Sequence, residues 1–114
     1  MRDAEDTLYA ARIRDAVLRI RDYTREMDQA AFVAHSLTSD AVCMNLLAIG
    51  ENASKLSATA RALTSEIEWR DAINLRHRIA HGYEDLSLSI LWSIVVVELD
   101  PLRAAAERIV AAET

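Results

Sequence analysis

Turn-forming residues are almost absent from this chain, which has two glycines and one proline in 114 residues. A sheet built from hairpins needs turn residues at short intervals, and these are missing here. Alanine, leucine, arginine and glutamate dominate the rest of the sequence and favour helices. The scarcity of turn residues therefore predicts an all-α protein.

Apolar periodicity divides the chain into helices. Half of the residues are apolar, enough for one core, and the length suits one domain over residues 1–114. The first helix is expected to begin at Asp6 or Thr7, either of which can accept a hydrogen bond from the free amides of the first turn. Further helices are expected over about 39–56, 69–81, from 85 or 87 to Pro101, and 102–112, with short turns within 28–34 and 57–66. The prediction is a bundle of four to five helices.

The two glycines have separate expected roles. Gly50 lies inside a predicted helix, where glycine costs up to about 1 kcal/mol against alanine, so we expect it to permit close contact with another helix. If the neighbouring Glu51 faces inward, it needs a cationic partner, and the arginines within 76–78 are the candidates. Gly82 follows a predicted helix end and fits the left-handed conformation that often occurs there.

Charge and hydropathy limit the possible functions. The formal net charge of −5 argues against a protein that coats nucleic acid through bulk electrostatics, although a local cationic site remains possible. The N-terminal stretch is charged, and the longest apolar stretch, 90–99, is too short to span a bilayer. We therefore expect a cytoplasmic protein without a membrane segment. The single cysteine, Cys43, cannot form an internal disulfide and is expected to be a small buried hydrophobe.

The stretch LRHRIAHGY (75–83) concentrates cationic and proton-transferring side chains. His77 and His81 stand four residues apart, as in zinc-binding helices, but the intervening Arg78 opposes a cation, and cysteine partners are missing. We therefore expect no metal and no cofactor. In a purely structural interpretation, His81 would stabilise a helix C-terminus. Arg76 and Arg78 would then pair with acidic residues such as Glu51, Glu66 or Asp71.

Phosphate chemistry is the alternative interpretation. An arginine such as Arg76 offers a planar fork of donors for phosphate oxygens, and a histidine such as His81 can take or give a proton at cellular pH. Together they suffice for metal-independent cleavage of RNA, in which the ribose 2′-hydroxyl attacks the neighbouring phosphorus. Residues 76 and 81 lie about 140° apart around a regular helix, so they would converge more easily across the two-fold axis of a homodimer.

At these residues the sequence resembles the HEPN domains, and specifically the HepT-type toxins of bacterial and archaeal toxin–antitoxin pairs. The signature of that family is an arginine, a polar residue, a few variable residues and a histidine, followed in this branch by any residue and a tyrosine. Here it reads RHRIAHGY (76–83), with His77 in the place most often held by asparagine. The likeness extends to AIGENASKLS (48–57), to WRDAINLRHRIAHGY (69–83) and to LWSIVVVELDPL (91–102), which carries an extra Asp100.

The resemblance implies a single HEPN domain that forms a homodimer and cuts RNA as the toxin of a type II-like or type VII toxin–antitoxin system. It implies catalysis by Arg76 and His81 in a composite site at the dimer interface, with His77, Arg78 and Glu51 in support. It also implies a cognate minimal nucleotidyltransferase as antitoxin, which can transfer AMP to Tyr83. The alternatives are a non-catalytic nucleotide- or substrate-binding subunit of a two-chain nucleotidyltransferase, and a structural dimerisation module.

Overall fold

The computed structural model describes residues 5–82 and 86–112, and within these residues it contains seven helices and no strand. The five longer helices correspond to those expected from the sequence. The two six-residue helices, α2 and α4, occupy the expected connections. In chain order the helices are α1 (Asp6–Thr24), α2 (Gln29–Ala34), α3 (Ser36–Ala53), α4 (Ala58–Leu63), α5 (Trp69–Ala80), α6 (Leu88–Val97) and α7 (Leu99–Ala112). The all-α prediction is confirmed.

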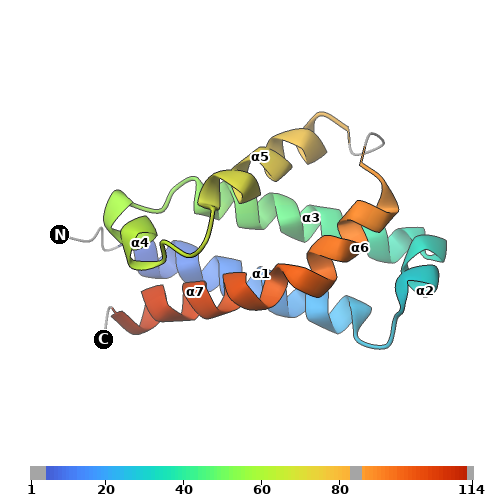
Figure 1. Ribbon diagram of the computed structural model, residues 1–114, viewed down its shortest axis with the longest axis horizontal. Coiled ribbons are helices and arrows are strands. Elements are labelled where there is room, and N and C mark those ends of the chain that lie inside the picture. The colour runs from blue at the N-terminus through green and yellow to red at the C-terminus, as the bar shows by residue number, and fades with distance from the viewer. Residues whose placement is uncertain (1–4, 83–85, 113–114) are drawn as a thin grey trace.

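Helix α1 is central, with α3 on one side and α7 on the other, and α3 carries α5 on its far side (Figure 1). The shared core consists of aliphatic side chains at helical spacing, such as Ile13, Val17 and Ile20 of α1, which are fully buried. Helix α5 packs mainly on α3, whereas α5 and α7 make little contact. One side of the bundle, between α5 and the α6–α7 pair, is therefore open.

The start of α1 differs from the expectation. Neither Asp6 nor Thr7 caps the helix; Glu5 holds the N-cap position without a side-chain capping bond, and its carboxylate accepts from the Tyr9 hydroxyl at 2.8 Å. Asp6 is fully buried, and its carboxylate accepts hydrogen bonds from the backbone N (2.9 Å) and Oγ (2.6 Å) of Ser57. Ser57 Oγ also accepts from the amide of Ala60 and so caps α4. Asp6 thus joins α1 to the connection that leads toward α5.

Helix α3 begins three residues earlier than expected, at Ser36. The ring Nδ1 of His35 accepts a hydrogen bond from the backbone N of Thr38 (3.2 Å), so His35 is the N-cap of α3. The preceding helix is capped conventionally, because the Asp28 carboxylate accepts from the amide of Ala31 at 2.8 Å. These caps fix the chain reversal that makes α1 and α3 antiparallel.

The beginning of α5 is anchored by Trp69, whose indole Nε1 donates to Thr64 Oγ1 at 2.9 Å inside the core. Farther along, Ser87 caps α6 by accepting from the amide of Ile90. Helix α6 ends at Val97, earlier than the expected end at Pro101, and α7 begins at Leu99 instead of Leu102. Pro101 therefore lies in the first turn of α7, where its missing N–H breaks no hydrogen bond within the helix. Across the described residues, no helix combines the length and the apolar character that crossing a bilayer would require.

Candidate functional site

The close approach of α3 and α5 at Gly50 positions Arg76. A Cβ atom placed on Gly50 would lie 2.4 Å from the Cβ of Arg76 and 2.8 Å from the carbonyl oxygen of Ala72. Both distances are far below van der Waals contact, so any side chain at position 50 would force the helices apart. The expectation that Gly50 permits close helix packing is confirmed, and the residue that it accommodates is the candidate catalytic arginine.

Arg76 is held by an ion pair with Glu51. Its Nη2 lies 2.6 Å from Glu51 Oε2, while Lys55 Nζ lies 3.7 Å from the other carboxylate oxygen. The Arg76 side chain remains 33 % exposed. The expected pairing of Glu51 with an arginine of 76–78 is therefore present, and it is made by Arg76. Since a guanidinium has five N–H donors, the pair orients Arg76 and leaves further donors for an anion.

His81 marks the end of α5. Its backbone N donates to the carbonyl of His77 (3.2 Å), and Gly82 follows with a φ of 114°, in the conformation expected for a glycine after a helix. The ring Nδ1 of His81 also lies 2.9 Å from the His77 carbonyl oxygen. Because a carbonyl oxygen only accepts, this contact requires the proton on Nδ1 and leaves Nε2 as the basic nitrogen. The ring is exposed, so Nε2 is accessible to a substrate.

A shallow hollow of about 330 Å³ surrounds this helix end and is lined by His77, Arg78, His81, Gly82 and Leu86. The structure thus brings together three of the candidate site residues, His77, Arg78 and His81. Arg76 does not line the hollow, because its side chain turns toward α3 and Glu51. Within one chain, Arg76 and His81 therefore diverge, as their angular separation on the helix predicted. Tyr83, the expected modification site, lies outside the described residues.

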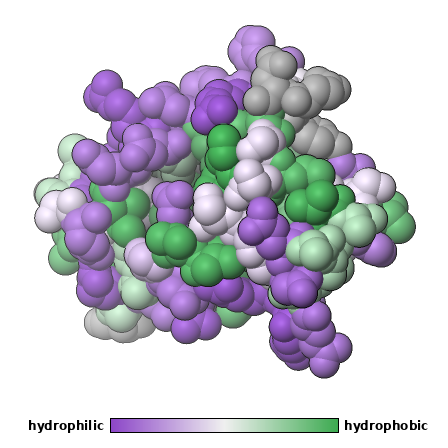
Figure 2. Space-filling view, turned by 45° about the vertical axis from the view of Figure 1, so that its right-hand side comes forward, coloured by the Kyte–Doolittle hydropathy of each residue, from purple (hydrophilic) through white to green (hydrophobic). Residues whose placement is uncertain are grey.

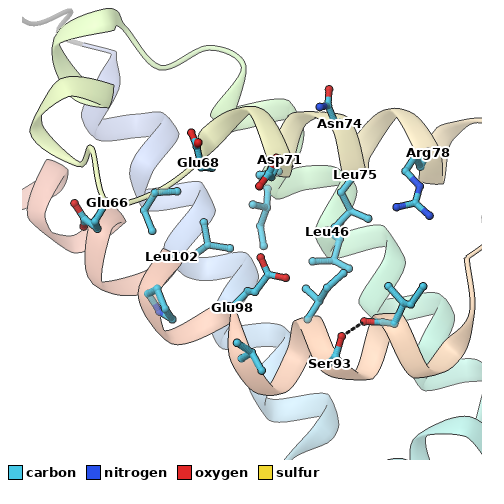
Figure 3. A pocket seen from close by; sticks show the side chains of 17 residues that line it. Leu46, Glu66, Glu68, Asp71, Asn74, Leu75, Arg78, Ser93, Glu98 and Leu102 are labelled. Atoms are coloured by element: carbon cyan, nitrogen blue, oxygen red, sulfur yellow. Dashed lines mark hydrogen bonds between the residues drawn. The ribbon is translucent and has the colours of Figure 1, made fainter.

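A larger groove of about 620 Å³ runs along the open side of the bundle between α5 and the α6–α7 pair. Its floor includes Leu46 and Ile49 of α3, and Figure 3 shows Leu75 and Leu102 lining it from opposite sides. Four carboxylates border it: Glu66, Glu68, Asp71 and Glu98. Figure 2 shows apolar side chains gathered on one face of the molecule among hydrophilic ones. The groove was not predicted from the sequence, because it depends on which helices fail to pack. Three of its lining residues, Asp71, Leu75 and Arg78, do recur at helical spacing.

Other candidates for chemistry are accounted for. Cys43 is buried, and burial, together with the negative charge of Asp40, raises the pKa of its thiol to about 11. The thiol is therefore protonated at neutral pH and is a core residue, not a nucleophile. In the part of the chain that the structure describes, no three His, Cys, Asp or Glu side chains converge as a metal ion would require.

A helical bundle that presents an arginine-rich helix end and a histidine with one free basic nitrogen has the fold and the functional groups of a small helical endoribonuclease. Comparison with known proteins agrees. The chain belongs to the HepT-like ribonuclease family, whose model, described as "Ribonuclease HepT-like", matches residues 13–109.

Two relatives match nearly their whole length. A protein of Thermococcus cleftensis named "Probable ribonuclease HepT" is 28 % identical over 101 residues, covering 89 % of this chain and 92 % of the relative. A protein of Methanocaldococcus jannaschii, assigned as an RNase (MJ1380), is 24 % identical over 106 residues, covering 93 % of this chain and 95 % of the relative. No solved structure matches the chain significantly.

Proposed function

We propose that this protein is the ribonuclease toxin of a toxin–antitoxin pair and that it cleaves RNA without a metal ion. The observation that carries the proposal is the arrangement at the end of α5. His81 has its Nδ1 bound to the His77 carbonyl in an exposed ring, at the end of the helix that carries Arg76, Arg78 and His77. Membership of a ribonuclease family supports RNA as the substrate.

In the proposed reaction, His81 Nε2 takes the proton of a ribose 2′-hydroxyl. The 2′-oxygen then forms a bond to the adjacent phosphorus, and the bond from phosphorus to the 5′-oxygen breaks. An imidazolium returns a proton to that leaving oxygen, which gives a 2′,3′-cyclic phosphate and a 5′-hydroxyl. Arg76 donates hydrogen bonds to the phosphoryl oxygens, on which negative charge increases in the transition state. DNA lacks the attacking hydroxyl and is spared.

The site is proposed to be completed by a second copy of the chain. Arg76 faces α3, whereas His81 lines the hollow at the helix end, so one chain does not direct both groups at one phosphate. In a two-fold dimer, Arg76 of one chain and His81 of the other can face the same phosphate. Several large apolar side chains are exposed, which supports such a contact. They include Leu37, Met44, Ile90, Val96 and Val97.

Metal independence is tested by following cleavage of a single-stranded RNA by the purified chain with and without excess chelator. We expect equal rates, because His81 and Arg76 supply the base and the charge stabilisation that a metal would otherwise provide. Cyclic phosphate termini on the products would identify 2′-hydroxyl attack. A rate that collapses in chelator and returns with a divalent cation would contradict the proposed chemistry. Intact RNA under all conditions would favour a non-catalytic subunit.

We further propose that a cognate minimal nucleotidyltransferase inactivates the toxin by modifying Tyr83. The proposal rests on the position of Tyr83 in the sequence, two residues after His81. Its phenolic oxygen would attack the α-phosphorus of ATP, and pyrophosphate would leave. The attached AMP carries a phosphate that can pair with Arg76 or Arg78 and so occupy donors that RNA needs.

Tyr83→Phe should therefore retain RNA cleavage but resist the partner. Mass spectrometry of the chain co-expressed with the partner should show AMP-sized additions on wild type and none on the variant. The same partner with its own active site disabled is the control. If the partner silences Tyr83→Phe as well as wild type, inhibition occurs by binding alone.

A further inference from the structure

The solvent-facing side of α5 carries a continuous polar stripe. Arg70, Asn74, His77 and His81 follow one another at spacings of four, three and four residues, which places them on one face of the helix. All four side chains are exposed, and exposed Arg78 lies beside them. Asn74 also borders the groove, while in Figure 3 its amide lies on the outer side of α5. From residue 70 to residue 81 the stripe extends about 16 Å along the helix.

The cations of this stripe are not neutralised, in contrast to most cations of the protein. Arg70 and Arg78 form neither an ion pair nor a hydrogen bond through their side chains with any described residue. Arg12 on α1 is the only other described arginine or lysine of this kind. The paired cations are Arg14, Arg21, Arg25, Lys55, Arg76, Arg103 and Arg108, and Arg19 and Arg61 donate to uncharged oxygens. Two of the three uncompensated arginines thus lie on α5.

The groove beside α5 is bordered mostly by carboxylates, although Arg78, next to the stripe, also lines it. Glu68, Asp71 and Glu98 border the groove without a described cationic partner, whereas Glu66 is paired with Arg108. Three unpaired carboxylates against Arg78 leave the groove with an excess of negative charge, and such asymmetry directs a polyanion at short range toward the outer side of α5. The groove is therefore a less favourable place for RNA than the outer side of α5.

We propose that this stripe is the path of the RNA strand beyond the scissile phosphate, with Arg70 binding a phosphate several nucleotides away. The inference rests on the proposed function only for the statement that the bound strand is then cleaved. Exposed arginine is suited to this role, because its donors match phosphate oxygens, and Asn74 adds an uncharged donor between Arg70 and His77. Neither Arg70 nor Asn74 belongs to the Arg–His motif of residues 76–83.

The test uses the full-length protein and a single-stranded RNA oligonucleotide whose 2′-hydroxyls are methylated, so that it binds without being cleaved. Its affinity is measured over a range of salt concentrations for wild type, Arg70→Ala and Arg12→Ala. Arg12 is the matched control, because it is also exposed and unpaired but lies on α1. Loss of one phosphate contact should lower the slope of log affinity against log salt by about 0.7 for Arg70→Ala. Arg12→Ala should keep the wild-type slope.

With cleavable RNA, Arg70→Ala should raise KM several-fold and leave kcat within about twofold, because Arg70 does not contact the reacting atoms. Equal slopes for Arg70→Ala and Arg12→Ala would overturn the proposed path. A change in oligomeric mass on Arg70→Ala, seen by light scattering, would assign Arg70 to a contact between copies and would also overturn it. An Arg70-dependent slope in a protein that cleaves no RNA would support the path and reject the proposed ribonuclease mechanism.

Discussion

Replacement of Arg76 or His81 by alanine is expected to slow RNA cleavage at saturating substrate by at least about 100-fold. Loss of a positioned general base or acid typically costs 10²–10⁴-fold, and loss of one donor to a developing charge costs about 10²–10³-fold. His81→Asn is a useful companion, because asparagine is tolerated at helix ends but transfers no proton. Rates are measured with purified variants of unchanged helical content. Arg103→Ala, which removes a partly exposed, ion-paired arginine of α7, is the matched control and should cleave normally.

Mixing the two inactive variants tests the shared site directly. If a site combines Arg76 of one copy with His81 of the other, each mixed dimer of Arg76→Ala and His81→Ala has one intact site. Random exchange of subunits should then restore about a quarter of wild-type activity, because half of the dimers are mixed and each has one of two sites. If both residues act within one chain, no mixed dimer has an intact site and activity stays lost. Wild-type rates in both single variants would remove the two residues from the mechanism.

Gly50→Ala is expected to lower the free energy of unfolding by about 1–3 kcal/mol, the usual cost of overpacking a tight contact. The added methyl would collide with the Cβ of Arg76 and with the carbonyl oxygen of Ala72, neither of which can move without α5. This cost opposes the gain of up to about 1 kcal/mol that alanine brings to a helix. Thermal unfolding followed by circular dichroism should show a lower Tm, by about 4 °C for each kcal/mol.

Gly50→Ala should also slow RNA cleavage by more than the loss of folded protein explains, because the displaced helix carries Arg76 and His81. Met44→Ala is the matched control on the same helix; Met44 is 66 % exposed, so its removal should change stability by less than about 0.5 kcal/mol. A Gly50→Ala protein that is more stable than wild type would show that α3 and α5 are not in close contact at Gly50.

The features that were predicted correctly from the sequence follow from local rules. Helix content follows from composition, the glycine after α5 has the expected positive φ, and the divergence of Arg76 and His81 follows from the geometry of a single helix. The sequence limits the partner of Glu51 to the arginines within 76–78, because Glu51 follows Gly50 inside a predicted helix and these arginines lie in the cationic stretch 75–83.

The features that were missed depend on distant partners. Asp6 has the chemistry of a helix cap, but it is used 51 residues away at Ser57, which no local pattern indicates. His35 caps α3, although histidine is not among the preferred capping residues. The excess of unpaired carboxylates in the groove over the outer side of α5 appears only when it is known which charged side chains lack a partner. That requires the three-dimensional arrangement of side chains far apart in the sequence.

The one-sided packing of α5 has a consequence for the cooperativity of the molecule. Helix α1 is held between two neighbours, whereas α5 is attached mainly along α3, and its other long flank faces the open groove. Segments with few buried contacts open locally at a lower free energy than the whole domain unfolds. The helix that carries the reactive side chains is therefore expected to be less protected against hydrogen exchange than α1. Because α5 is held in place mainly by its contact with α3, the chain can lose the arrangement of its reactive side chains while most of the bundle remains folded.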